Sequence, residues 1–256
     1  MQDRIRGILL DLDGTVYIGN ELIPGADKTI EFLRKHDIPF RFVTNTTSKP
    51  RSEVSSKLAS LGISVPVEDI FTAPAIAASY LKAKGISRCF FLLRPSLMGD
   101  LPEVQAVDEN PQAVLVGDLG DDFTYNKLNR AFRFIEEGAA FITMAKNRYF
   151  RKPDGLYLDV GAFVAALEYA SRTEARCIGK PSHTFFQIAA DSMDLPLSQI
   201  AMIGDDIESD VFGAQDVGLF GIQVQTGKFN REFLTHSEKK PDQILPSLAD
   251  LPQWLS

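Results

Sequence analysis

Two aspartates lie one residue apart near the start of the chain, in the stretch GILLDLDGTVY. Asp11 and Asp13 follow an apolar run that is typical of a buried strand. Two carboxylates about 4 Å apart repel each other by about 4 kcal/mol at the effective dielectric of a protein surface. The pair therefore indicates either a simple turn or a site whose ligand is a cation.

A second group of acids lies in the stretch IAMIGDDIESD, again after an apolar run. One acid is expected where a helix begins, because a carboxylate caps the free backbone N–H groups there. Asp205, Asp206 and Asp210 are more acids than one cap needs. Together with Asp11 and Asp13 they predict a cation site of carboxylate oxygens. Mg²⁺ suits such ligands when water and a substrate phosphate complete its coordination.

Two other interpretations of the DLDG stretch are a calcium loop and a surface turn. An EF-hand loop needs glycine at its sixth position and glutamate at its twelfth. Counting from Asp11, these positions hold Val16 and Leu22, so the calcium loop is disfavoured. A surface turn stays open for this stretch taken alone, because Asp and Gly are common in turns.

Groups that could bind phosphate lie between the two acidic stretches. Thr44, Asn45 and Thr46 offer side-chain and backbone donors at the end of a predicted strand, where such donors hold phosphoryl oxygens. Lys180 lies between a glycine and a proline, at a turn where its ammonium could neutralise a carboxylate or a phosphate. The alternatives are a polar turn that caps the next helix and a solvated lysine, and these residues alone leave both open.

Short β-rich runs alternate with helical patterns along the chain, which predicts an α/β fold with a mostly parallel sheet. The predicted strands are 4–10, 39–44, 88–93, 113–117, 139–145, 175–179, 200–204 and 219–224. The predicted helices are 24–36, 50–61, 73–85, 124–138, 160–172, 182–194 and 208–214, and a short helix in the tail 241–256. Trp254 of this tail is expected to pack on the core. The stretches DLDGT, TNTTS, GKPS and GDDIESD all stand at predicted strand ends, so they are expected to meet in one cleft.

Length and charge limit the class of protein. The chain has 256 residues and a formal net charge of −7, which argues against a nucleic-acid binder that neutralises phosphates. Cys89 and Cys177 lie far apart in apolar stretches, so neither a disulfide framework nor a CxxC metal site is expected. No apolar stretch is long enough for a signal peptide or a membrane span, so no membrane partner is expected and the protein is predicted to be cytoplasmic.

The stretches DLDGT, VTNTT, GKP and GDDIESD occur in this order, and the set resembles the four motifs of the haloacid dehalogenase (HAD) superfamily of phosphohydrolases. The long insert between the second and third motifs resembles the α/β cap of the NagD-like, type-II (C2) capped subfamily. The resemblance implies a Rossmann-like HAD core with a mostly parallel sheet at 1–75 and 178–256, into which a C2-type cap domain at 76–177 is inserted.

The resemblance also implies roles for the motif acids. Asp11 would be the nucleophile that forms an aspartyl-phosphate, and Asp13 would protonate the leaving group and then activate water. The cofactor would be Mg²⁺, bound by Asp11, by Asp205 and by the backbone carbonyl of Asp13. The phosphoryl group of a small phosphorylated substrate would be held by Thr44, Asn45 and Lys180. Further candidate site residues are Thr46, Asp206, Asp210, Arg148 and Asp159.

Specificity is expected to lie in the insert, because cap loops close over a substrate and exclude water. The candidates are Lys146, Arg148, Tyr149 and Asp159, in or near the basic stretch MAKNRYFRK. Its positive charge suits an anionic substrate, although a solvated basic loop is an equally open interpretation. The resemblance also implies a possible homodimer through the cap.

The main functional prediction is a Mg²⁺-dependent phosphatase of small phosphorylated molecules. The stretch GLYLDVGAFVAALEYA resembles a branch of the subfamily that hydrolyses P–N and P–O–P bonds. A hydrolase of phospholysine, phosphohistidine or pyrophosphate is therefore the alternative. A catalytically silent binding protein of the same fold is a third interpretation, which the intact acids and lysine disfavour.

Overall fold

The chain divides into two units, and the computed structural model describes residues 4–152 and 154–256. The first unit comprises Met1–Thr44, Arg51–Phe71 and Lys180–Ser256, and the second comprises Asn45–Pro50 and Thr72–Gly179. The limits expected for the insert, 76 and 177, lie a few residues inside those of the second unit. Residues 45–50, expected in the core, group with the second unit instead.

A six-stranded sheet forms the middle of the first unit, with the strand order β15-β14-β13-β1-β4-β5. Its strands are β1 (Gly7–Asp11), β4 (Phe40–Thr44), β5 (Ile70–Thr72), β13 (Ile200–Gly204), β14 (Phe220–Val224) and β15 (Gln243–Leu245). The pairings from β4 across to β15 are all parallel, so the carboxyl ends of these strands lie at one edge. Open α/β sheets bind their ligands at that edge.

The apolar pattern of β1 explains why this sheet is buried on both faces. All five residues of β1 are buried, as is typical of a central parallel strand. Ile8 and Leu10 belong to a core cluster that also contains Ile30 of the following helix. Leu9 points to the opposite face, because side chains alternate along a strand, and it is fully buried there.

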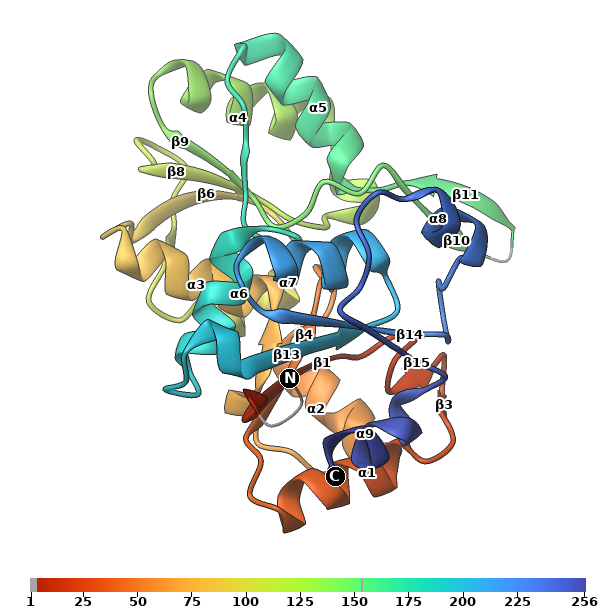
Figure 1. The fold of residues 1–256 in the computed structure, drawn as a ribbon. Helices are drawn as coiled ribbons and strands as arrows, with labels where there is room; N and C mark the ends of the chain where they lie inside the picture. The colour runs from red at the N-terminus through yellow and green to blue at the C-terminus, as the bar shows by residue number, and fades with distance from the viewer. Residues whose placement is uncertain (1–3, 153) are drawn as a thin grey trace. The chain divides into compact units, whose positions relative to one another are not determined.

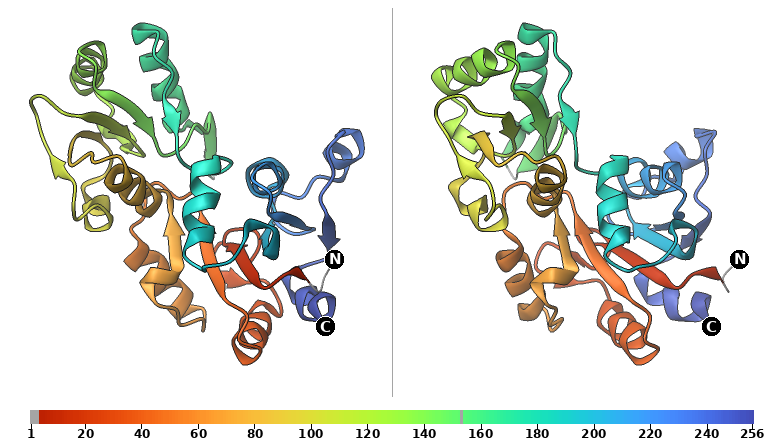
Figure 2. Two further views of the ribbon diagram at one scale, coloured as in Figure 1. Left: turned by 60° about the vertical axis from the view of Figure 1, so that its left-hand side comes forward. Right: turned by 90° about the vertical axis from the view of Figure 1, so that its left-hand side faces the viewer.

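Helices cover both faces of this sheet (Figures 1 and 2). The helices of this unit are α1 (Ala26–Lys35), α2 (Arg51–Ser60), α6 (His183–Asp191), α7 (Gly213–Asp216), α8 (Arg231–His236) and α9 (Leu251–Leu255). Shorter turns are the 3₁₀ segments η2 (Val67–Asp69), η5 (Leu197–Gln199) and η7 (Leu248–Asp250) and the π-helical η6 (Ile207–Phe212). A hairpin of β2 (Tyr17–Ile18) and β3 (Glu21–Leu22) follows β1.

The second unit has a parallel sheet of its own, with the order β12-β9-β8-β6-β7. Its strands are β6 (Arg88–Leu92), β7 (Gln105–Ala106), β8 (Ala113–Val116), β9 (Ala140–Thr143) and β12 (Arg176–Cys177). Its helices are α3 (Ala73–Ala83), α4 (Tyr125–Glu136) and α5 (Val160–Ser171), with 3₁₀ turns η3 (Pro95–Asp100) and η4 (Gly120–Asp122). An antiparallel hairpin of β10 (Tyr149–Lys152) and β11 (Gly155–Leu158) precedes α5 (Figure 1). The predicted α/β architecture with an inserted α/β domain is confirmed.

The structure differs from the sequence-based expectation in its short strands. The tail begins with β15, which pairs with the edge of β14, whereas a helix alone was expected there. The basic stretch after β9, treated as a loop, enters the β10–β11 hairpin. Strands of three or four residues contain too few alternations for periodicity to reveal them. Trp254 lies against Phe220 with ring centroids 5.6 Å apart, so the predicted packing of the tail is confirmed.

Both cysteines are free thiols. Cys89 is buried, and burial raises its pKa to about 12. It therefore stays protonated and unreactive at neutral pH. Over the described ranges of the chain, none of the helices combines the length and the apolar character that crossing a bilayer requires.

Candidate active site

Residues from distant parts of the sequence meet at the carboxyl edge of the first unit's sheet. Asp11 is the last residue of β1, and Asp205 directly follows β13. Strands β1 and β13 are parallel neighbours, so both end at the same edge. Lys180 lies two residues before Ser182, the N-cap residue of α6.

The Lys180 ammonium pairs with two buried carboxylates. Its Nζ lies 2.6 Å from Oδ1 of Asp11 and 2.6 Å from Oδ1 of Asp210, and only 5% of the residue is exposed. Burial by itself would lower the pKa of Lys180, but the two carboxylates outweigh burial and raise the pKa above its usual value. The lysine is therefore charged at neutral pH, and its charge-assisted hydrogen bond orients Asp11.

Asp11, Asp205 and Asp210 form an acid cluster in which one oxygen of each lies within 4.8 Å of the others. Burial raises the pKa of Asp205 to about 6, that of Asp210 to about 7 and that of Asp11 above its usual value. When all three are ionised, the carboxylates beside the single Lys180 ammonium leave two negative charges uncompensated. Buried oxygen ligands with this excess charge fit one divalent cation such as Mg²⁺.

Asp206 stands outside this cluster and caps η6. Its Oδ1 accepts a hydrogen bond from the backbone N–H of Ser209 at 3.0 Å, and its Oδ2 accepts one from Nζ of Lys228 at 3.0 Å. Burial opposes ionisation, but the Ser209 amide and the Lys228 ammonium lower the pKa of Asp206. The capping interpretation of the GDDIESD stretch therefore holds for this one acid.

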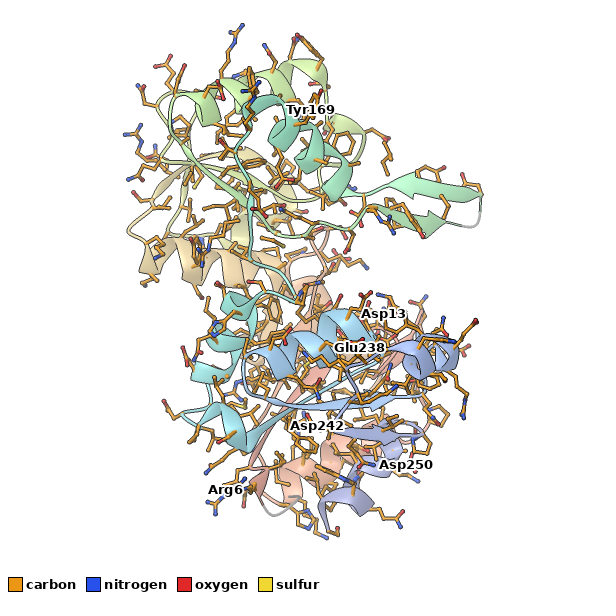
Figure 3. The ribbon with its side chains drawn as sticks, turned by 45° about the horizontal axis from the view of Figure 1, so that its top comes forward. Arg6, Asp13, Tyr169, Glu238, Asp242 and Asp250 are labelled. Atoms are coloured by element: carbon orange, nitrogen blue, oxygen red, sulfur yellow. The ribbon has the colours of Figure 1, made fainter. Side chains whose placement is uncertain are left out.

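Asp13 is exposed, and its carboxylate does not belong to the acid cluster. Figure 3 shows Asp13 at the opposite end of the first unit from Arg6, which precedes β1. Gly14 follows it with a φ of +92°, a conformation that glycine adopts without strain. A Cβ at Gly14 would lie 2.0 Å from Oδ2 of Asp205, so this turn packs directly against the cluster.

The phosphate-binding candidates of the TNTTS stretch are divided between the units. Thr44 is the last residue of β4, and the register of β4 on β1 places Val43 beside Asp11. Thr44 therefore lies at the same sheet edge as the acid cluster. Asn45 and Thr46 are half-buried and belong to the segment that groups with the second unit.

The candidates of the insert lie in the second unit, where two of them have structural partners. Asp159 caps α5, because its Oδ1 accepts the helix's first N–H at 2.7 Å. Lys146 donates to Oε1 of Glu168 at 2.7 Å. Arg148 and Tyr149 are exposed. Arg148 and Asp159 therefore stay predictions as substrate contacts.

Sequence reasoning missed the turn at residues 226–228, which follows β14. Its backbone and side chains contact Gly14 and the two acids that follow β13. The available signal was the stretch VQTGK, in which a threonine, a glycine and a lysine follow another predicted strand. The contact with Asp205 comes from the Lys228 backbone amide, and the contact of Thr226 is to a backbone carbonyl, so residue type alone does not reveal them.

The raised pKa values predict how the stability of the metal-free protein depends on pH. The folded state keeps protons on Asp205 and Asp210 at pH values where the unfolded chain has released them. The resulting stability is complete below the unfolded-state pKa of about 4 and is lost as the pH rises through about 6 to 7, by up to about 1.4 kcal/mol per group and pH unit. We expect the unfolding temperature in EDTA to fall from pH 5 to pH 8.

Asp205→Asn is the matched variant for this measurement, because it removes one titrating group and leaves an acceptor for its hydrogen bond. Its unfolding temperature should depend less steeply on pH. An unfolding temperature of the unsubstituted protein that rises over this interval would contradict the raised pKa values.

Comparison with known proteins gives consistent matches along the chain. A family model described as haloacid dehalogenase-like hydrolase matches residues 8–106, and one described as HAD-hydrolase-like matches residues 177–251. Haloacid dehalogenase-like hydrolase domain-containing protein 2 of Mus musculus is 39% identical over 229 residues, which cover 88% of this chain and 86% of that protein. Phospholysine phosphohistidine inorganic pyrophosphate phosphatase of Homo sapiens is 36% identical over 253 residues, which cover 96% of this chain and 92% of that protein.

Solved structures show the same fold. A 4-nitrophenylphosphatase from Thermotoga maritima has a TM-score of 0.92 and 28% identity, and the match covers 100% of this chain and 99% of that one. A glycerol phosphate phosphatase from Mycobacterium tuberculosis, solved in complex with magnesium, has a TM-score of 0.88 and 27% identity, with 98% and 78% covered.

Proposed function

Because this chain belongs to the haloacid dehalogenase-like hydrolases and is a phosphohydrolase of that family, we propose that it is a Mg²⁺-dependent phosphatase of small phosphorylated molecules that works through a phosphorylated aspartate. The observation that carries the proposal is the buried pair of Asp11 and Lys180 beside two further carboxylates. This arrangement orients one carboxylate and supplies positive charge for a transferring phosphoryl group. The catalytically silent alternative is not retained.

Asp11 is the nucleophile in this proposal. Its Oδ1 accepts the hydrogen bond from Lys180, which fixes the orientation of the carboxylate. A carboxylate oxygen forms a bond to phosphorus while the bond from phosphorus to the leaving oxygen breaks. The covalent route replaces one difficult displacement by water with two easier steps.

Asp13 carries out the proton transfers. Its carboxyl group is exposed, so it can reach a leaving group and a water molecule. It gives a proton to the leaving oxygen and then takes one from the water that attacks the phosphorylated Asp11. The second step releases inorganic phosphate and restores both aspartates.

Thr44, Asn45 and Lys180 hold the phosphoryl oxygens in this proposal. Mg²⁺ held by Asp11, Asp205 and the backbone carbonyl of Asp13 would supply charge stabilisation for the transferring group. The excess negative charge of the acid cluster supports this assignment, as does the magnesium complex of the similar M. tuberculosis phosphatase. The role of the Asp210 carboxylate is to orient Lys180, to which it binds at 2.6 Å.

The proposal is tested by hydrolysis of p-nitrophenyl phosphate. We expect activity in Mg²⁺, a loss of at least about 100-fold in EDTA, and recovery when Mg²⁺ is returned, because the metal stabilises charge on the transferring group. Initial rates measured against Mg²⁺ concentration give the result. Equal rates with and without EDTA would contradict a Mg²⁺-dependent phosphatase.

A second candidate is a hydrolase of P–N or P–O–P bonds. It is favoured by the 36% identity to a human protein named as a phospholysine, phosphohistidine and inorganic pyrophosphate phosphatase. Values of kcat/KM for imidodiphosphate and pyrophosphate, compared with those for sugar phosphates, separate the candidates. A preference of about tenfold or more corresponds to about 1.4 kcal/mol in the transition state and would decide between them.

A homodimer through the inserted unit is a further part of the proposal. Tyr149, Leu156 and Leu158 of the β10–β11 hairpin are 55%, 57% and 67% exposed, and clustered exposed apolar residues are typical of protein contacts. Light scattering measures the mass in solution, which should be twice the chain mass of 28.3 kDa. A monomer at micromolar concentration would contradict the dimer.

A further inference from the structure

We propose that residues 226–228, the TGK turn, are a positioning element that aims the Asp205 carboxylate at a bound cation. The inference rests on the proposed Mg²⁺-dependent function and assigns part of it to a segment outside the four motifs. The TGK turn follows β14, the strand next to β13, so it reaches the sheet edge from which Asp205 projects.

The first contact is a backbone hydrogen bond to the acid itself. The N–H of Lys228 donates to Oδ2 of Asp205 at 2.7 Å, and Asp205 is only 3% exposed. This bond engages Oδ2 of the carboxylate, and the inference assigns the other oxygen, Oδ1, to the cation. A ligand whose second oxygen is already held is oriented before the metal arrives.

The second contact is a close approach that only glycine permits. Gly227 has a φ of +56°, and a Cβ there would lie 2.0 Å from Oδ2 of Asp205 and 2.7 Å from Cα of Gly14. A Cβ at Gly14 would meet the same Oδ2 at 2.0 Å. Both glycine turns therefore pack closely against the same oxygen of Asp205.

The third contact joins the two turns to each other. The hydroxyl of Thr226 donates to the backbone oxygen of Gly14 at 2.5 Å, across 212 residues of sequence. Gly14 directly follows Asp13, whose carbonyl is assigned to the metal in the proposed function. One threonine thus couples the position of that turn to the position of Asp205.

The Lys228 side chain has a separate partner. Its Nζ binds Oδ2 of Asp206 at 3.0 Å, and 72% of the lysine side chain is exposed. The positioning of Asp205 is therefore assigned to the Lys228 backbone, to Gly227 and to Thr226, and not to the lysine ammonium.

The test is calorimetric titration of the purified full chain with MgCl₂ alone. Gly227→Ala and Thr226→Val should raise the Kd for Mg²⁺ at least tenfold, the first by displacing the carboxylate and the second by releasing the Gly14 turn. Thr226→Ser keeps the hydroxyl and should bind within threefold of the unsubstituted protein. Lys228→Met keeps the backbone N–H and should also bind within threefold.

Gly19→Ala is the control for backbone strain. Gly19 has a φ of +58°, which matches Gly227, and nothing lies within 4 Å of where its Cβ would be. Gly19→Ala should therefore lose only the stability that the left-handed backbone costs, whereas Gly227→Ala should lose more in EDTA because its Cβ also meets Asp205 and Gly14, and only Gly227→Ala should lose Mg²⁺ affinity. The unfolding temperature in EDTA separates the two effects.

The outcomes distinguish this inference from the proposed function. Unchanged Mg²⁺ affinity in Thr226→Val or in folded Gly227→Ala would overturn the positioning role, whatever the activity of the protein. If the protein hydrolysed p-nitrophenyl phosphate but bound no Mg²⁺, the positioning role would also be overturned, while the assignment as a phosphatase would stand. If the variants bind Mg²⁺ more weakly but the unsubstituted protein hydrolyses no phosphate ester, the positioning role would be supported and the proposed phosphatase activity would be overturned.

Discussion

Asp11→Asn is expected to lower kcat for p-nitrophenyl phosphate by more than about 10³-fold, because an amide cannot replace the attacking carboxylate. The substitution keeps the size of the side chain, so the packing of β1 should be preserved. Rates are measured at saturating Mg²⁺, and acid quenching of a reaction with ³²P-labelled substrate should trap label on the unsubstituted protein alone.

Asp108→Asn is the matched control. Asp108 also pairs with a basic side chain, at 2.8 Å from Arg130, but its side chain is 80% exposed and lies in the second unit. Its kcat should not change. If purified Asp11→Asn kept activity within tenfold of the unsubstituted protein, Asp11 would not be the nucleophile.

Lys180→Met is expected to destabilise the metal-free protein by about 3–5 kcal/mol at pH 8, because it leaves buried carboxylates without their partner. Lys180 and its two partners are 3%, 10% and 2% exposed by side chain. Urea unfolding measures the change. The loss should shrink toward pH 5, since Asp210 has a pKa of about 7 and is protonated there.

Lys82→Met removes a lysine–carboxylate pair of nearly the same length. Nζ of Lys82 lies 2.7 Å from Glu103, with 69% and 64% of the side chains exposed. Solvent screening limits such a pair to about 0–1 kcal/mol. If both variants lost the same free energy of unfolding, the ion pairs of Lys180 would contribute no more to stability than an exposed pair.

The fold was predictable where the apolar pattern is long. The central strand β1 and the amphipathic helix α4 were expected within a few residues of their observed bounds. β15 was not expected, because its three residues form a strand only by pairing with β14. The conformation of such a segment is decided by its neighbour in space, which local pattern does not contain.

The candidate site was predictable where it depends on side-chain chemistry. Asp11 and Asp205 were expected to meet because they end predicted strands of one parallel sheet, and the register of β1 on β13 brings them together. The TGK turn was missed because two of its three contacts, the Lys228 amide and the conformation of Gly227, are properties of the backbone. Asp210 was a further candidate site residue, and the structure places its carboxylate 2.6 Å from Lys180.

The interruption of the first unit by the second has a consequence for synthesis on the ribosome. Strand β4, one neighbour of β1, is synthesised soon after it. The other neighbour, β13, is synthesised only after all of Thr72–Gly179. Every residue of the inserted unit precedes Lys180, so this unit can fold while one edge of β1 in the nascent chain is still unpaired. The entropy cost of closing a loop grows only slowly with its length, so the insert lowers the stability of the finished protein little. The main risk during synthesis is aggregation through the strand edge of β1, which stays exposed until β13 has been made.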